Sequence, residues 1–223
     1  MIALPSFRPV IALFDAYATR VGSTLSAEQK FLRQEAAGTL DDLQYLVQEI
    51  ITLNSSLVAH QDERAKAMLD SLRSAGDKDP QLAEFLRDNP NLQSSGISSV
   101  YGPGSEDLVP EQDREPLREL RLKTEQFYQL AHRLAKVIPL LPHLAAFEHK
   151  PIAIIRNQLI EHPEGKASKV LFDSFGFGTV TGPVVKALRV GTQVAPHADA
   201  GLYPNAIGLI NALTKALTKA AEK

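Results

Sequence analysis

Residues 39–57 read TLDDLQYLVQEIITLNSSL, and apolar side chains recur in this stretch at steps of three and four. Such steps put side chains on one face of an α-helix, because the helix turns once in about 3.6 residues. The repeating residues are Leu40, Leu43, Val47, Ile50, Leu53 or Asn54, and Leu57. The pattern predicts a single long helix over residues 39–75, with 54–56 (Asn-Ser-Ser) as a weak point inside it.

A second stretch with the same periodicity covers residues 113–138. Its apolar seam predicts a helix that packs against a neighbouring helix, in the same chain or in a partner. The seam residues are Leu117, Leu120, Thr124, Phe127, Ala131, Leu134 and Ile138. Shorter helices are predicted over 8–21, 80–87 and 205–222, the last with Ile207, Ile210, Leu213 and Leu217 as its apolar face. Ser26 and Gln29 resemble a capping box that opens a further helix, and Gly38 is expected to end it.

The composition agrees with helices packed on helices. The chain has 223 residues, of which 44% are hydrophobic and 22% charged, and it contains no tryptophan. These values suit one good-sized soluble domain with a real core. We therefore predict an all-α, or mostly α, fold: a single helical domain over residues 1–223, built as a bundle of five to seven helices.

Two segments interrupt the helical pattern. Residues 88–112 are rich in proline, glycine and serine, which predicts a long loop or insertion. Residues 163–205 are rich in glycine and proline and are expected to form an arm. Within this arm, 169–172 and 184–188 are expected to be short strands of a small β-hairpin or an irregular arm.

Charge and cysteine content exclude several classes of protein. The formal net charge of −2 argues against a nucleic-acid binder that relies on a large basic surface. The absence of cysteine excludes disulfides, thiol catalysis and the usual structural zinc sites. No signal peptide and no membrane-spanning stretch are recognised. A cytoplasmic protein with no membrane partner and no cofactor is the expectation.

The stretch that suggests chemistry is RNQLIEH, residues 156–162. Arg156 supplies a permanent cation, Asn157 an amide and His162 a titratable base, which together can hold a phosphate and move a proton. Pro151 and Pro163 bracket the segment as a helix. Six residues separate the Arg from the His, so they point about 120° apart on one helix. A bend, a long Arg reach or a second subunit is needed to bring both onto one group.

The spacing Arg-Asn-x4-His resembles the signature of the HEPN superfamily (higher eukaryotes and prokaryotes nucleotide-binding domains). The resemblance implies a compact helical bundle that forms a homodimer, with the motifs of two subunits meeting across a two-fold axis. It further implies a metal-independent endoribonuclease of toxin–antitoxin or defence type, with RNA as substrate and an antitoxin or other regulatory protein as partner. Arg156 would bind the scissile phosphate, His162 would be the acid/base group, and Asn157 the polar residue that follows the Arg.

Other interpretations stay open. The chain is alternatively a catalytically inactive binding or scaffold module that uses the motif as a dimer interface, with His162 capping its helix. A nucleotide-binding regulator would use the glycines of 176–182, and a basic cluster at Lys166, Lys169, Lys186 and Arg189 would support RNA contact. A metal site would draw on His143, His149, His162, Glu148 and Glu161. His60 and His132 are expected to satisfy hydrogen bonds within their own helices.

Overall fold

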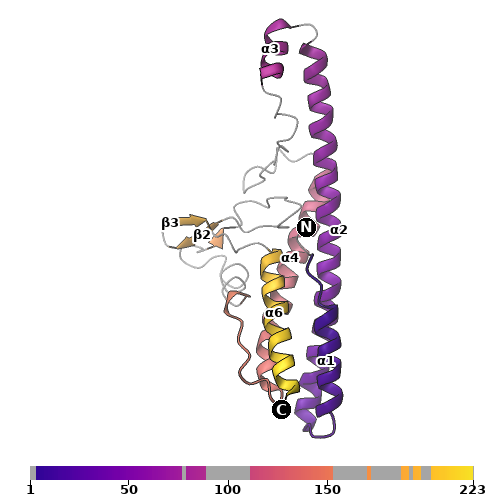
Figure 1. Ribbon diagram of the computed structural model, residues 1–223, viewed down its shortest axis with the longest axis vertical. Helices are drawn as coiled ribbons and strands as arrows, with labels where there is room; N and C mark the ends of the chain where they lie inside the picture. The colour runs from indigo at the N-terminus through magenta and orange to yellow at the C-terminus, as the bar shows by residue number, and fades with distance from the viewer. Residues whose placement is uncertain are drawn as a thin grey trace.

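A computed structural model describes residues 4–76, 79–88, 111–152, 170–171, 187–190, 193–196 and 202–222. Five α-helices dominate this part of the chain, which confirms the all-α class (Figure 1). They are α1 (Arg8–Val21), α2 (Ala27–Gly76), α3 (Pro80–Asp88), α4 (Glu111–Val137) and α6 (Leu202–Ala221), and a 3-10 turn, η3 (Ile138–Leu140), follows α4.

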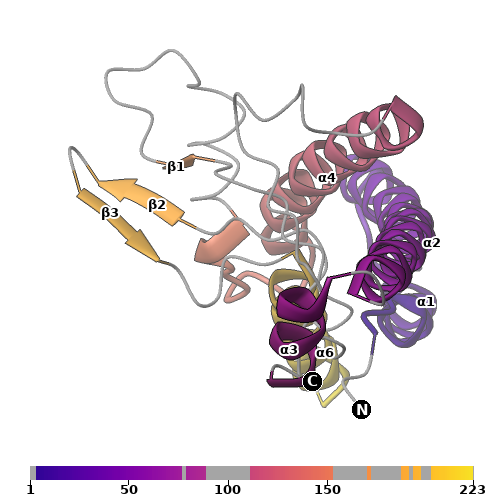
Figure 2. The ribbon, with the colours of Figure 1, turned by 90° about the horizontal axis from the view of Figure 1, so that it is seen from above.

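The long helix α2 runs the length of the molecule, and the other helices are arranged around it. In Figure 1, α1, α4 and α6 lie along one half of α2, while α3 folds back beside its far end. Seen from above in Figure 2, α1, α2, α4 and α6 form one cluster of helices. Ion pairs show that α2 and α4 are antiparallel, since Glu35 pairs with Arg133 at 2.6 Å whereas Glu49 pairs with Lys123 at 3.4 Å.

The core follows the predicted apolar stripes of α2 and α4. On α2 the stripe is fully or nearly fully buried. Of the two alternatives predicted for one position of the stripe, Asn54 is buried and Leu53 is only partly buried. On α4 the seam is buried from Leu120 to Leu134, while Leu117 is partly buried. Both predicted helices are therefore confirmed, and α2 and α4 make the most extensive contact between any two described elements.

One predicted helix boundary is wrong. Gly38 was expected to end a helix, yet α2 continues through it and through 54–56 without interruption, for 50 residues. A Cβ at Gly38 would meet no atom within 4 Å, so this glycine is a solvent-facing position in mid-helix. Its conformational cost is overcome by the apolar residues on both sides, Ala36 and Leu40, which are buried.

Capping explains how α1 and α2 begin. The predicted capping box is confirmed, because the Gln29 backbone N–H donates to Ser26 Oγ at 3.2 Å and the Ser26 N–H donates to Gln29 Oε1 at 3.1 Å. Helix α1 has no side-chain cap of its own. Instead Gln44 Oε1, from α2, accepts the backbone N–H groups of Phe7 at 2.6 Å and Arg8 at 3.2 Å. The start of α1 is thus satisfied by a neighbouring helix.

Helix α6 begins at Leu202, slightly before the predicted residue 205, and its buried face is shifted from the prediction. Leu209, Leu213 and Leu217 are buried, whereas Ile210 is only partly so. Two polar contacts fix α6. The Asn205 Nδ2 amide donates to Tyr128 Oη at 3.1 Å in the core. At the other end, the Arg20 guanidinium donates to the carbonyls of Ala220 and Ala221, which lack partners within the helix.

The described strands form a small antiparallel sheet in the order β1-β2-β3, which stands to one side of the helices (Figures 1 and 2). Strand β1 (Val170–Leu171) pairs with β2 (Ala187–Val190), as expected for a hairpin within the arm. Strand β3 (Gln193–Pro196) pairs with β2 and was not predicted. Most of the expected 88–112 loop, residues 89–110, lies outside the described part of the chain.

Replacing Gly38 by alanine is expected to stabilise the protein by about 0.5–1 kcal/mol, because Ala has the higher helix propensity and the new Cβ meets open space. Urea unfolding monitored by circular dichroism measures the change. Gly22→Ala is the matched control: its Cβ would lie 3.0 Å from the Ala18 carbonyl oxygen, so no gain is expected there. Equal gains at both sites would contradict the packing described for Gly22.

Removing the Gln44 cap is expected to destabilise the protein. Gln44→Ala leaves the Phe7 N–H without its acceptor and the Arg8 N–H with only Ser6 Oγ, at 3.4 Å, and we expect a loss of about 1–2 kcal/mol. The control is Gln48→Ala on the exposed face of α2, which should change stability by less than about 0.5 kcal/mol. Thermal or urea unfolding gives both values, and a neutral Gln44→Ala would show that water replaces the cap.

Candidate functional site

The predicted catalytic residues Arg156, Asn157 and His162 lie outside the described residues, so the structure neither brings them together nor separates them. The segment leading into them is described. Residues 150–152 are helical, which agrees with the helix start predicted at Pro151. Ile152 is fully buried in the core. The chain therefore enters the motif segment, residues 153–162, from a helical turn that is anchored on the bundle.

The connection from α4 to this turn is held at both ends. At its beginning, the Tyr17 hydroxyl on α1 donates to the Pro142 carbonyl at 2.8 Å. At its end, the His149 ring lies against α6, where Nε2 is 3.6 Å from the position that a Cβ on Gly208 would occupy. Leu144 and Phe147 are buried between these two points. The residues just before the motif segment are thus well fixed on α1 and α6.

A second polar group, which the sequence did not single out, joins α2 to the start of α4. Asp113 is 1% exposed, and its Oδ1 lies 3.3 Å from His60 Nδ1. Its Oδ2 lies 2.5 Å from Arg64 Nη2, an ion pair without hydrogen-bond alignment. His60 had been expected to bond within its own helix, and its partner is instead on α4. We call these three residues the α2–α4 clasp.

The chemistry of the clasp follows from its exposure. The buried carboxylate needs compensation, which the cation of Arg64 and the imidazole of His60 provide together. The His60 side chain is 42% exposed, and its Nδ1 is engaged by Asp113, so Nε2 is the ring nitrogen that remains for solvent. A carboxylate that orients an imidazole in this way is also a feature of proton-transferring sites. The position of the clasp between two helices makes a structural role sufficient to explain it.

A signal for the clasp was present in the sequence. Asp113 stands seven residues before Leu120, so it occupies the buried seam of α4 rather than the polar face. His60 and Arg64 are one helical turn apart on α2 and reach toward the same neighbour. A charged residue on an apolar seam requires a partner, but the identity of that partner depends on how α2 and α4 are aligned.

The structure describes only some of the residues of the other candidate sites. His143 and His149, offered as metal ligands, are in the described connection, while Glu161 and His162 are not. Within the described ranges, no three His, Cys, Asp or Glu side chains gather as metal ligands would. The lysines of the proposed basic cluster, Lys166, Lys169 and Lys186, and the glycines of 176–182 lie outside those ranges.

Among the described helices, none combines the length and the apolar content that a bilayer crossing requires.

Asp113→Ala is expected to destabilise the protein by about 2 kcal/mol, because Arg64 would lose the partner of a largely buried charge. We expect a smaller loss of stability than for a fully buried ion pair, because the side chains of Arg64 and His60 are both partly exposed to solvent. Glu84→Ala on α3 is the control, because the Glu84–Arg87 pair is exposed on both sides and should contribute little. Urea unfolding compares the two, and equal small losses would mean that the clasp adds no stability.

Comparison of the chain with protein-family models, with curated proteins and with solved structures found no match in any of the three.

Proposed function

We propose that this chain is an HEPN-like, metal-independent endoribonuclease whose reacting groups are Arg156, Asn157 and His162. The observation that carries the proposal is the order and spacing of these residues, a cation and an amide followed after four residues by a titratable base. No other stretch of the sequence places an Arg-Asn pair ahead of a histidine at this spacing, and the combination offers a phosphate-binding group together with a proton carrier.

The described part of the chain supports the proposal in two ways. The fold is a helical bundle, as the resemblance implies. The helical turn at 150–152 also begins where the motif helix was expected, and buried Ile152 fixes that turn on the core. A rigid support of this kind is what a catalytic group requires, because small displacements reduce the rate strongly.

In the proposed reaction the ribose 2′-hydroxyl attacks the adjacent phosphorus. A bond forms between the 2′-oxygen and phosphorus while the bond from phosphorus to the 5′-oxygen of the next nucleotide breaks. His162 accepts the proton of the 2′-hydroxyl, and the departing 5′-oxygen takes up a proton from the His162 of a second subunit or from water. Arg156 stabilises the charge that develops on the phosphate oxygens, and Asn157 holds the geometry. The products are a 2′,3′-cyclic phosphate and a free 5′-hydroxyl.

Two copies of the chain are part of this proposal. Arg156 and His162 diverge by about 120° on one straight helix, so a composite groove between two subunits supplies both to one phosphate. The net charge of −2 agrees with a small local contact with RNA rather than a large basic surface. An antitoxin or another regulatory protein would control the activity.

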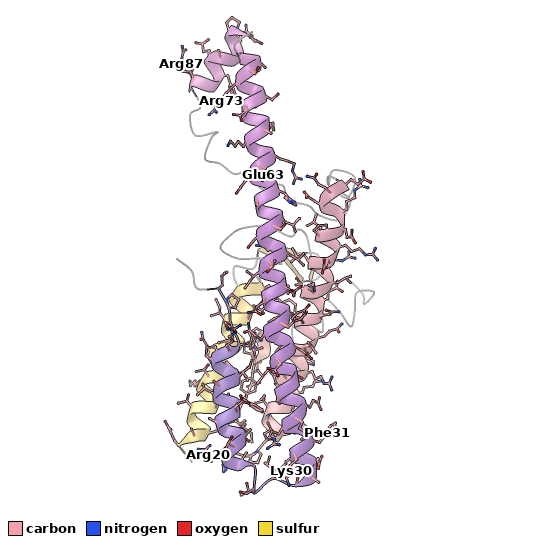
Figure 3. The ribbon with its side chains drawn as sticks, turned by 90° about the vertical axis from the view of Figure 1, so that its right-hand side faces the viewer. Arg20, Lys30, Phe31, Glu63, Arg73 and Arg87 are labelled. Atoms are coloured by element: carbon pink, nitrogen blue, oxygen red, sulfur yellow. The ribbon has the colours of Figure 1, made fainter. Side chains whose placement is uncertain are left out.

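A second candidate, an inactive binding or scaffold module, is favoured by the far end of α2. Beyond the α2–α4 clasp, which lies next to Glu63 in Figure 3, α3 is the one other described helix that accompanies α2. Met68 on α2 and Phe85 on α3 are each more than half exposed in this projecting hairpin. Exposed apolar side chains at a protruding tip are typical of contacts with another protein. In this reading the motif forms hydrogen bonds across a dimer interface and does not cleave RNA.

Cleavage of end-labelled single-stranded RNA and transfer RNA in EDTA tests the proposed function. The wild-type protein is expected to leave 2′,3′-cyclic phosphate ends, and His162→Ala should reduce the rate by at least about 100-fold, the usual contribution of an acid/base group. His143→Asn is the matched control. It removes another histidine, and asparagine tolerates the positive φ of 62° found at that position.

Full activity in His162→Ala would overturn the assignment of the acid/base group. Absence of cleavage by every variant would favour the binding module instead. In that case Arg156→Ala should weaken the dimer, which sedimentation equilibrium would detect as a fall in average mass with dilution.

A further inference from the structure

His149 occupies a junction between the fold and the proposed active site. It directly precedes the helical turn at 150–152, which leads into the motif segment, residues 153–162. Its side chain is less exposed to solvent than the side chains of its two neighbours. Glu148 and Lys150, on either side, are exposed and form a surface ion pair at 3.4 Å, whereas His149 is half-buried against α6.

The contact of His149 with α6 is specific. The imidazole faces the backbone of α6, with Nε2 3.6 Å from the position that a Cβ on Gly208 would occupy. A glycine at this position of α6 leaves the helix backbone open to the imidazole. The Nδ1 atom on the other side of the ring is also buried and has no hydrogen-bond partner. Burial lowers the pKa of His149. The ring is therefore neutral at pH 7.

Helix α6 is itself fixed at both ends, which makes it a suitable support. Asn205, one turn before Gly208, donates to the buried hydroxyl of Tyr128 on α4. The final carbonyls of α6 are held by Arg20 of α1. A side chain that contacts α6 at Gly208 is therefore held in a defined place relative to α1 and α4.

We propose that His149 is a positioning residue: by holding the helical turn at 150–152 on α6, it sets the point from which the chain enters the motif segment. Its importance for cleavage rests on the proposed function, whereas its effect on the local backbone does not. His149 touches neither RNA nor a reacting group in this proposal, and it acts through the helix that follows it.

Hydrogen–deuterium exchange measured by mass spectrometry tests the proposal directly. In His149→Ala, amides of peptides covering 150–162 are expected to exchange at least about tenfold faster than in the wild type, because the local opening becomes easier. Peptides from α1 and α2 should be unchanged. His149→Gln is the conservative variant, since its Nε2 amide can take the place of the imidazole Nε2, and it should restore most of the protection.

Lys150→Ala provides the control for a change of side chain at the same place in the chain. Lys150 is exposed and its ion pair with Glu148 is on the surface, so exchange in 150–162 should stay within about twofold of wild type. Unchanged exchange in His149→Ala would overturn the proposal. Faster exchange throughout the chain, or no rescue by glutamine, would also overturn it, because His149 would then be an ordinary packing residue.

The same variants separate this inference from the proposed function. If the wild type cleaves RNA, His149→Ala should lower kcat by about tenfold with little change in KM, and His149→Gln should recover it. Cleavage that is equally fast in His149→Ala, despite faster local exchange, would refute a catalytic consequence of the positioning. If the wild type does not cleave RNA, the proposed function fails, and the exchange data alone decide whether His149 holds the segment.

Discussion

The antiparallel packing of α2 against α4 is the constraint on which the rest of the molecule depends. Burial of the α4 seam from Leu120 to Leu134 against the α2 stripe from Leu40 to Leu57 removes the apolar faces of both helices from water. This packing also fixes how the two helices are aligned along their axes. Every polar contact between them, from Glu35–Arg133 at one end to the α2–α4 clasp at the other, requires that one alignment.

The remaining helices are attached by completing each other's ends. Gln44 of α2 accepts the first N–H groups of α1, and Arg20 of α1 donates to the last carbonyls of α6. The first N–H groups and the last carbonyl groups of a helix lack hydrogen-bond partners within it, so they require outside partners in any arrangement of helices. Here the partners come from neighbouring helices, which links the position of α6, and of His149 upon it, to the central pair.

The sequence was a good guide wherever the signal was local. The bounds of α1, the capping box of Ser26 and Gln29 and the seams of α2 and α4 follow from spacing and residue type within a few turns. Gly38 misled because its intrinsic preference was outweighed by apolar neighbours whose burial depends on another helix.

The cap from Gln44 and the partner of Asp113 could not be predicted, because both depend on which residues two distant segments bring opposite each other. The motif at 156–162 was found from its spacing alone. Its chemistry stays a prediction, since three residue types in order do not determine how two helices or two subunits present them. The role inferred for His149 came from the structure, because a lone histidine two residues before a proline carries no such signal.

The unbroken length of α2 has a consequence for how the protein behaves in solution. Fifty residues of α-helix extend about 75 Å. A compact chain of 223 residues would have a radius of gyration of only about 17 Å. A particle built around such a rod tumbles and diffuses slowly for its mass. In gel filtration a monomer of 24.4 kDa would therefore elute early, near the place of a compact dimer. Subunit number must accordingly be read from light scattering or sedimentation equilibrium, which weigh the particle, and not from its apparent size.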